Sequence, residues 1–186
     1  EVRKTNETDV SVTLNLDGTG QRDIDTGIGF LDHMLELFAC HGRFDLAVRC
    51  KGDLRVDGHH TTEDIGIVLG KLIARLLGDK KGIERYAAAY VPMDESLARV
   101  VVDVSGRPYL KFNGDLRGRI GDYDGELTEE FFRAVCSNAM ITLHIDLLRG
   151  ANTHHMCEAI FKSFGRALGA ASRIVSDKVL SSKGSL

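Results

Sequence analysis

Two copies of one polar motif could bind metal. Each copy has two adjacent histidines with a carboxylate three residues after the second, at the head of an apolar helical stretch. The residues are His59, His60 and Glu63 in VDGHHTTEDIG, and His154, His155 and Glu158 in NTHHMCEAIF. On a helix, positions i, i+3 and i+4 share a face, so each carboxylate lies beside its histidines. Imidazole and carboxylate groups that converge on one point are ligands for a divalent metal.

Adjacent histidines point about 100° apart on a helix and do not easily bind the same ion. Two copies of the motif remove this conflict if two ions lie between them and each copy gives one histidine to each ion. His33, on an earlier helix, can add a ligand to one ion, and Glu130 can do the same for the other. Nitrogen and oxygen ligands without sulfur favour Mn²⁺, Fe²⁺ or Co²⁺ over structural zinc.

A single HHxxE motif would also fit a purely structural interpretation. A histidine beside an apolar helix is more often a core or capping residue than a ligand. Thr61, and Asn152 or Thr153, could simply cap helices. The second copy and its upstream partner favour metal, because His33 precedes the first motif by 26 residues and Glu130 precedes the second by 24.

The surrounding pattern supplies the elements that must position these residues. Alternating apolar residues predict strands, and apolar residues at helical spacing predict helices. The predicted strands are VSVTLNL (10–16), FDLAVRC (44–50), ARVVVDVSG (98–106), PYLKF (108–112) and ITLHIDLL (141–148). The predicted helices are GFLDHMLELFACHG (29–42), the stretch between His60 and Gly78, LTEEFFRAVCSNA (127–139) and THHMCEAIFKSFGRALGAA (153–171). The polar tail, SDKVLSSKGSL (176–186), is predicted to be irregular.

The order helix, strand, HHxxE motif, helix occurs twice, which indicates an internal duplication. Strands interleaved with helices predict an α+β protein. We therefore predict a single domain over residues 1–186, made of two similar sheet-plus-helices halves that form an α/β sandwich. The halves are expected at about 1–90 and 91–186.

The composition excludes several classes of function. Hydrophobic residues make up 43% and charged residues 27% of the chain, and the net charge is −3 with both signs interspersed. No basic field favours nucleic acid or a membrane surface, and no apolar run approaches the roughly 18 residues of a membrane span. The four cysteines form no CxxC pair and have apolar neighbours, so we expect reduced core thiols and a cytoplasmic protein.

A further group of residues could hold a small anion such as phosphate. Arginines at element boundaries can form a fork to phosphate, and a lysine four residues after Glu158 emerges beside the predicted metal site. For each residue alone, a surface salt bridge or a solvated tail is the simpler explanation. The candidates are Arg85, Arg107, Lys162, Ser181, Ser182 and Lys183, and His41 closes a helix and could face a site.

Taken together, several stretches closely resemble the imidazoleglycerol-phosphate dehydratases, lyases of histidine biosynthesis. The stretches are KTNET, DTGIGFLDHML, VDGHHTTEDIGIVLG, PMDESLARVVVDVSGRPYL, TLHI and NTHHMCEAIFKSFGRAL. The resemblance implies the loss of water from imidazole glycerol phosphate to give imidazole acetol phosphate, with two Mn²⁺ ions per site. It also implies homo-oligomers in which trimers assemble into a 24-subunit shell with sites at subunit interfaces.

The same resemblance assigns roles to residues. It places the ligands of one ion on His33, His59, Glu63 and His154, and those of the other on His60, His155, Glu158 and Glu130. It places substrate contacts on Glu7, His41, Arg85, Arg107, Lys162, Ser181, Ser182 and Lys183, with Glu7 as the catalytic acid. Many members have histidine where this chain has Glu130. A carboxylate can also bind Mn²⁺, so we expect a site with one additional negative charge.

Three other functions fit parts of the pattern. A two-metal phosphatase or other hydrolase also uses close ions and phosphate donors, but it would release inorganic phosphate. A metal-storage or metal-stabilised shell protein would bind metal without acting on a substrate. Di-iron bundle proteins pair histidine and glutamate, but they need long four-helix patterning, and the predicted strands argue against them.

Overall fold

The computed structural model describes residues 1–184, which form four helices and ten strands in two halves. The elements of the first half are β1 (Val2–Lys4), β2 (Thr8–Asn15), β3 (Arg22–Asp25), α1 (Gly29–Gly42), β4 (Asp45–Gly52) and α2 (His59–Leu77). The second half contains β5 (Tyr86–Met93), β6 (Ser96–Asp103), β7 (Tyr109–Asn113), β8 (Arg119–Ile120), β9 (Tyr123–Asp124), α3 (Leu127–Ala139), β10 (Thr142–Arg149) and α4 (Thr153–Ala171).

The two halves share one topology. The first sheet has the order β1-β2-β4-β3 and the second has the order β5-β6-β10-β7. In both sheets the first two pairings are antiparallel and the last is parallel. This repetition confirms the predicted fold class of two similar sheet-plus-helices halves. The division between the sheets falls between α2 and β5, a few residues before the expected boundary near residue 90.

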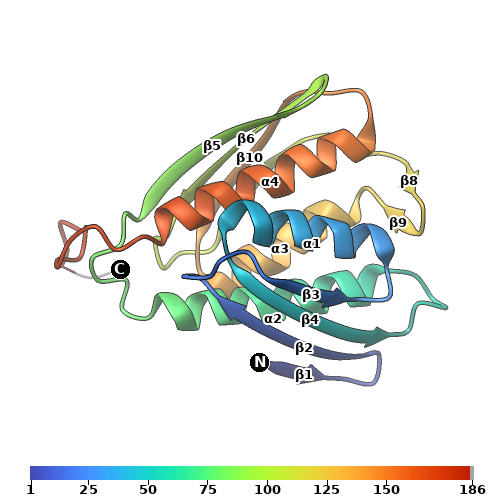
Figure 1. Cartoon of the computed structure of the whole chain (residues 1–186), viewed down its shortest axis with the longest axis horizontal. Helices are drawn as coiled ribbons and strands as arrows, with labels where there is room; N and C mark the ends of the chain where they lie inside the picture. The colour runs from blue at the N-terminus through green and yellow to red at the C-terminus, as the bar shows by residue number, and fades with distance from the viewer. Residues whose placement is uncertain (185–186) are drawn as a thin grey trace.

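The sheets lie on the outside of the molecule and the helices fill the space between them (Figure 1). The inward faces of the sheets are apolar, as the alternation of buried and more exposed residues along β2 and β6 shows. Helices α1 and α2 contact the first sheet, and α3 and α4 contact the second. Between these layers, α1 packs on α4 and α2 packs on α3, so each helix pair joins the two halves.

The sequence pattern placed the helices well. The predicted spans 29–42, 127–139 and 153–171 are confirmed at both ends, and α2 begins at His59, two residues before its predicted start. Strands β1, β3, β5, β8 and β9 were not predicted: four of them are at most four residues long, and YAAAYVPM in β5 has no alternation of apolar and polar residues. Of the four cysteines expected in the core, Cys40 is exposed. Within residues 1–184 no helix is long and apolar enough to span a bilayer.

Candidate metal centre

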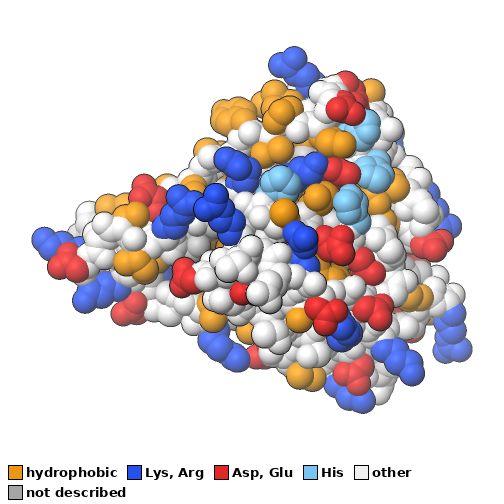
Figure 2. Space-filling model, in the orientation of Figure 1, with side chains coloured by type: hydrophobic (Ala, Val, Ile, Leu, Met, Phe, Trp, Pro, Cys, Tyr) orange, Lys and Arg blue, Asp and Glu red, His pale blue; other side chains and the backbone are white. Residues whose placement is uncertain are grey.

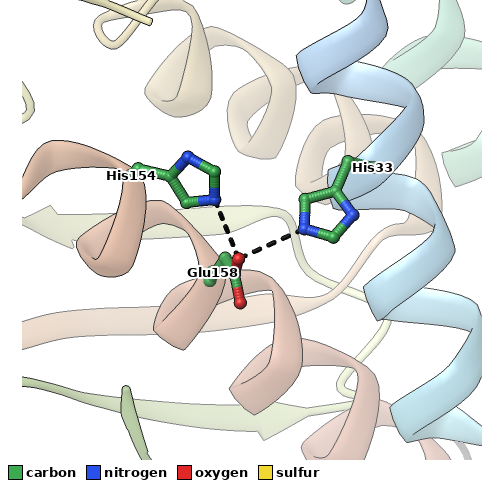
Figure 3. Close-up of side chains that lie close together, drawn as sticks. All are labelled: His33, His154 and Glu158. Atoms are coloured by element: carbon green, nitrogen blue, oxygen red, sulfur yellow. Dashed lines mark hydrogen bonds and ion pairs between the residues drawn. The ribbon is translucent and has the colours of Figure 1, made fainter. Parts of the chain in front are cut away.

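Three side chains from opposite halves of the sequence meet at one point (Figure 3). His33 Nε2 lies 3.1 Å from Glu158 Oε1, and His154 Nε2 lies 2.9 Å from the same oxygen. Within residues 1–184 this is the one group of three such side chains whose ligand atoms all lie within 4.8 Å of one another. We call His33, His154 and Glu158 the triad.

Local structure explains how the triad forms. His154 and Glu158 are one turn apart on α4, whose first turn is capped by Asn152: its side-chain oxygen accepts from the backbone N–H of His155 at 3.2 Å. His33 comes from α1, which approaches α4 closely where Gly165 faces the carbonyl of Phe38. Helix α4 therefore supplies His154 and Glu158, and the packing of α1 against α4 supplies His33.

Glu158 is held in its charged form. The carboxylate is buried, and burial opposes ionisation, but three hydrogen bonds outweigh this effect. The donors are Lys162, whose Nζ lies 2.5 Å from Oε2, and the two triad histidines. The resulting pKa of Glu158 is lowered to about 2. A permanent negative charge between two imidazole nitrogens is a suitable arrangement for a cation.

The donor set fits a divalent metal. It offers two imidazole nitrogens and one carboxylate oxygen, without sulfur, as Mn²⁺, Fe²⁺ or Co²⁺ prefer. The resemblance assigned Glu158 to the ion opposite that of His33 and His154. In the described chain Glu158 lies between these two histidines, while the assignment of each ligand to an ion stays a prediction. His154 contacts Glu158 because the i,i+4 relation along α4 brings the two side chains together.

The duplication predicts a matching group in the other helix pair. His59 and Glu63 on α2 correspond to His154 and Glu158, and Glu130 on α3 corresponds to His33. Their ligand atoms do not converge within 4.8 Å in the described chain, and Glu130 instead lies 3.5 Å from Arg133. Two carboxylates repel each other, whereas in the triad both histidines contact one carboxylate.

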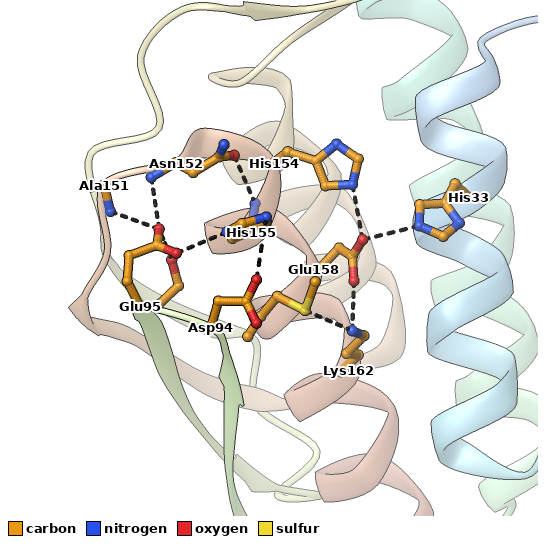
Figure 4. A network of polar contacts seen from close by, with 11 residues as sticks. His33, Asp94, Glu95, Ala151, Asn152, His154, His155, Glu158 and Lys162 are labelled. Atoms are coloured by element: carbon orange, nitrogen blue, oxygen red, sulfur yellow. Dashed lines mark hydrogen bonds and ion pairs between the residues drawn. The ribbon is translucent and has the colours of Figure 1, made fainter.

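The remaining motif histidines, His60 and His155, have carboxylate partners of their own. His60 Nδ1 lies 3.1 Å from Asp53 Oδ2, and its Nε2 lies 3.8 Å from Glu7. In the second half, His155 Nδ1 lies 2.8 Å from Glu95 Oε2 and its Nε2 lies 3.9 Å from Asp94 (Figure 4). Hydrogen bonds that the imidazoles donate to Asp53 and Glu95 raise the pKa of His60 and His155, respectively.

Sequence reasoning missed the partners Asp53, Asp94 and Glu95. They lie in loops before α2 and between β5 and β6, with no helical spacing to connect them to the histidines. Glu7, which the resemblance singled out, lies in the matching loop between β1 and β2. The order of the sheet strands makes the two hairpins equivalent, and this equivalence is visible only in the fold.

Several predicted anion-binding residues lie elsewhere. Arg85 is buried and forms an ion pair with Asp103 at 2.8 Å, and Arg107 approaches the same carboxylate at 3.9 Å. Arg85 also donates to the carbonyl of Leu180, next to Ser181, Ser182 and Lys183 in the tail. Arg85 precedes the first residue of β5, and the hairpin that contacts His155 follows its last residue. The eight residues of β5, as an extended strand, separate the two by roughly 25 Å. Only Lys162 contacts the triad directly among these described residues.

Histidine, acidic and basic side chains gather on one face of the molecule, beside a group of lysines and arginines (Figure 2). His41 lies in the last turn of α1, near Lys162 and Arg166 of α4. Burial lowers the pKa of His41, and the charges of Lys162 and Arg166 lower it further. His41, Arg166 and two other arginines, Arg43 and Arg173, line a cavity of about 350 Å³.

The comparisons with known proteins identify the family. A family model described as imidazoleglycerol-phosphate dehydratase matches residues 26–168, which include the triad and both HHxxE motifs. The chain belongs to the imidazoleglycerol-phosphate dehydratase family. It is therefore a hydro-lyase of histidine biosynthesis, as the names of its relatives also indicate.

The similarity extends over nearly the whole chain. The imidazoleglycerol-phosphate dehydratase of Acetivibrio thermocellus is 56% identical over 99% of this chain and 96% of its own length. The enzyme of Desulfotalea psychrophila is 57% identical over 99% of this chain and 94% of its own length. The crystal structure of the Staphylococcus aureus enzyme has a TM-score of 0.82 at 51% identity, covering 95% of this chain and 98% of that one. The Pyrococcus furiosus enzyme, solved with (S)-C348, has a TM-score of 0.87 at 35% identity over the full length of both chains.

Proposed function

We propose that the chain converts imidazole glycerol phosphate to imidazole acetol phosphate and water, and that this reaction depends on two divalent ions per site, with Mn²⁺ as the native metal. The observation that supports the metal dependence is the triad, whose three ligand atoms all lie within 4.8 Å of one another. A cytoplasmic location remains a prediction.

The fold suggests a revised grouping of the ligands. One ion takes His33, His154 and Glu158, and by the duplication the other takes His59, Glu63 and Glu130. His60 and His155 are then left over. Each points about 100° away from its neighbour along the helix, so each is placed to serve an ion held by another subunit.

The residues proposed to contact the substrate lie at two distant places in the chain. Arg85, Arg107 and the tail lie roughly 25 Å along β5 from the hairpin at His155. One small phosphorylated imidazole cannot reach both ends of a chain. We infer that the site is completed by a second copy, consistent with trimers that assemble into a 24-subunit shell. The cationic residues of one subunit would hold the phosphate while the triad end of another holds the imidazole.

The reaction removes a hydroxyl from the carbon next to the ring and a proton from the following carbon, and the resulting enol becomes the ketone. When bound, the metal supplies Lewis acidity, drawing electron density from the ring. Glu7 is placed 3.8 Å from His60 Nε2, where its carboxylate can take the proton from carbon. Arg85 and Arg107 of one subunit, together with Lys162 beside the triad of the other, bind the phosphate, which converts remote binding energy into orientation of the reacting carbons.

A product assay tests this function. The protein is stripped of metal, Mn²⁺ is added back, and imidazole glycerol phosphate is the substrate. We expect keto product only when metal is present, without release of inorganic phosphate. Free phosphate would indicate a hydrolase instead, and two tightly bound ions without any turnover would indicate a structural or storage role.

Glu7→Gln tests the assigned catalytic carboxylate. We expect it to bind metal and substrate as the unmodified protein does, with a loss of kcat of about 100-fold or more, because general acid–base catalysis contributes on that scale. The measurements are kcat, KM and the number of bound ions. Normal turnover in this variant would show that another group moves the proton.

A further inference from the structure

His60 and His155, which lie outside the triad, share one feature: the Nδ1 of each faces a carboxylate. His155 Nδ1 lies 2.8 Å from Glu95 Oε2, and His60 Nδ1 lies 3.1 Å from Asp53 Oδ2. A carboxylate only accepts, so a neutral imidazole in this contact carries its proton on Nδ1 and its lone pair on Nε2. We propose that Glu95 and Asp53 are positioning residues that keep His155 and His60 in the tautomer whose Nε2 can bind a divalent ion. This inference rests on the proposed function, because it assigns a metal to these nitrogens.

Glu95 cannot exchange its two oxygens freely (Figure 4). Its Oε1 accepts from the backbone N–H of Asn152 at 2.8 Å and from that of Ala151 at 3.2 Å. Backbone N–H groups only donate, so the atom at this position must be an acceptor. The other oxygen, Oε2, is thereby directed at His155. The contacts that tie the β5–β6 hairpin to the start of α4 therefore also fix the tautomer of the histidine.

This anchoring predicts an unusual effect of a nearly isosteric change, Glu95→Gln. The amide oxygen must take the Oε1 position, because the N–H groups of Ala151 and Asn152 require an acceptor. The NH₂ group then faces His155 Nδ1 and donates to it. Nδ1 becomes the acceptor and the proton moves to Nε2, so an ion can bind Nε2 only if this hydrogen bond is lost.

Asp53 offers a matched comparison, because the described chain places no backbone donor on its carboxylate. Both of its oxygens lie near His60 Nδ1, at 3.2 and 3.1 Å. In Asp53→Asn the amide can therefore turn its oxygen toward Nδ1 and keep the favourable tautomer. The same chemical change should be severe at Glu95 and mild at Asp53.

The experiment measures Mn²⁺ binding to the full-length protein, by competition with a fluorescent chelator and by counting the ions retained after gel filtration. We expect Glu95→Gln to weaken one of the two ions by about 10- to 100-fold, the range for outer partners of metal-binding histidines. Asp53→Asn should change neither ion by more than about threefold, since its hydrogen bond can be rebuilt. Binding of both ions by Glu95→Gln at the unmodified affinity, or an equal loss in both variants, would overturn the proposal.

A double-variant cycle shows whether Glu95 acts through the histidine. In a His155→Ala background, adding Glu95→Gln should not change the affinity further. A further loss would mean that Glu95 acts by another route. If the unmodified protein binds no divalent ion at all, the proposed function fails, which is a different result from a failure of the tautomer argument.

The tautomer of His155 can also be observed in the unmodified, metal-free protein, so this test does not depend on whether a variant folds. Neutron diffraction at alkaline pH should show deuterium on His155 Nδ1 and none on Nε2. Deuterium on Nε2 with a bare Nδ1 would overturn the assignment of Glu95.

Ser96→Ala is a control for the binding experiment. It removes a 3.0 Å hydrogen bond to Glu95 but leaves His155 untouched, so it should bind both ions as the unmodified protein does.

Discussion

The spacing of the triad depends on Gly165 having no side chain. A Cβ at this position would lie 2.4 Å from the carbonyl oxygen of Phe38, whereas ordinary contact begins at 3.4 Å. Gly165→Ala must therefore separate α1 from α4 by about 1 Å, because the added Cβ is fixed to the backbone of α4 and the carbonyl belongs to the backbone of α1, so neither atom can turn away. The 3.1 Å distance between His33 Nε2 and Glu158 Oε1 would widen to about 4 Å, beyond hydrogen-bond range.

Metal binding should respond strongly to this shift, since ligand distances in metal sites vary by only about 0.2 Å. We expect the affinity of the triad for Mn²⁺ to fall by about 10- to 100-fold, a loss as large as that caused by removing an outer partner of a ligand. The free energy of unfolding should fall by about 1–3 kcal/mol, the usual cost of overpacking. Chelator competition measures the first effect, and urea denaturation of the metal-free protein measures the second.

Leu143→Ala is the control for stability alone. Leu143 is fully buried on β10, and its truncation should cost about 2–5 kcal/mol without adding any atom between α1 and α4. This variant should keep the unmodified affinity for metal. The reasoning is refuted if Gly165→Ala binds Mn²⁺ normally while being destabilised, or if Leu143→Ala loses as much affinity.

Two further predictions concern the carboxylates. The pKa of Glu158 is lowered from 4.5 to about 2, so its contribution to stability is present above pH 4.5 and is lost as the pH falls toward 2. We expect the free energy of unfolding of the metal-free protein to fall by about 3 kcal/mol over this range. Urea denaturation of Glu158→Gln should show no such loss. The same dependence of the unfolding free energy on pH in both proteins would contradict the prediction. Glu130→Gln should reduce the bound ions from two to one per subunit while the triad ion stays, and retention of both ions would show that Glu130 is not a ligand.

Local physical chemistry let the sequence determine the helices and the repeated motif. Apolar residues at helical spacing and the Asn152 cap define α4 at both ends, and the same pattern places α1 and α3. The i,i+4 relation within HHxxE joins His154 to Glu158 in any helix, whatever surrounds it. Strands β1, β3 and β5 escaped prediction because the first two are only three and four residues long and the third has no alternation of apolar and polar residues.

Only the tertiary structure decided which side chains from the two halves meet at the triad. Side chains 125 residues apart, His33 and Glu158, meet because a glycine lets α1 and α4 approach closely. The contact between Glu95 and His155 spans 60 residues and depends on how a hairpin folds over the start of α4. Sequence spacing carries no information about such contacts, because the packing of whole layers determines them, and the same packing separates Arg85 from the triad.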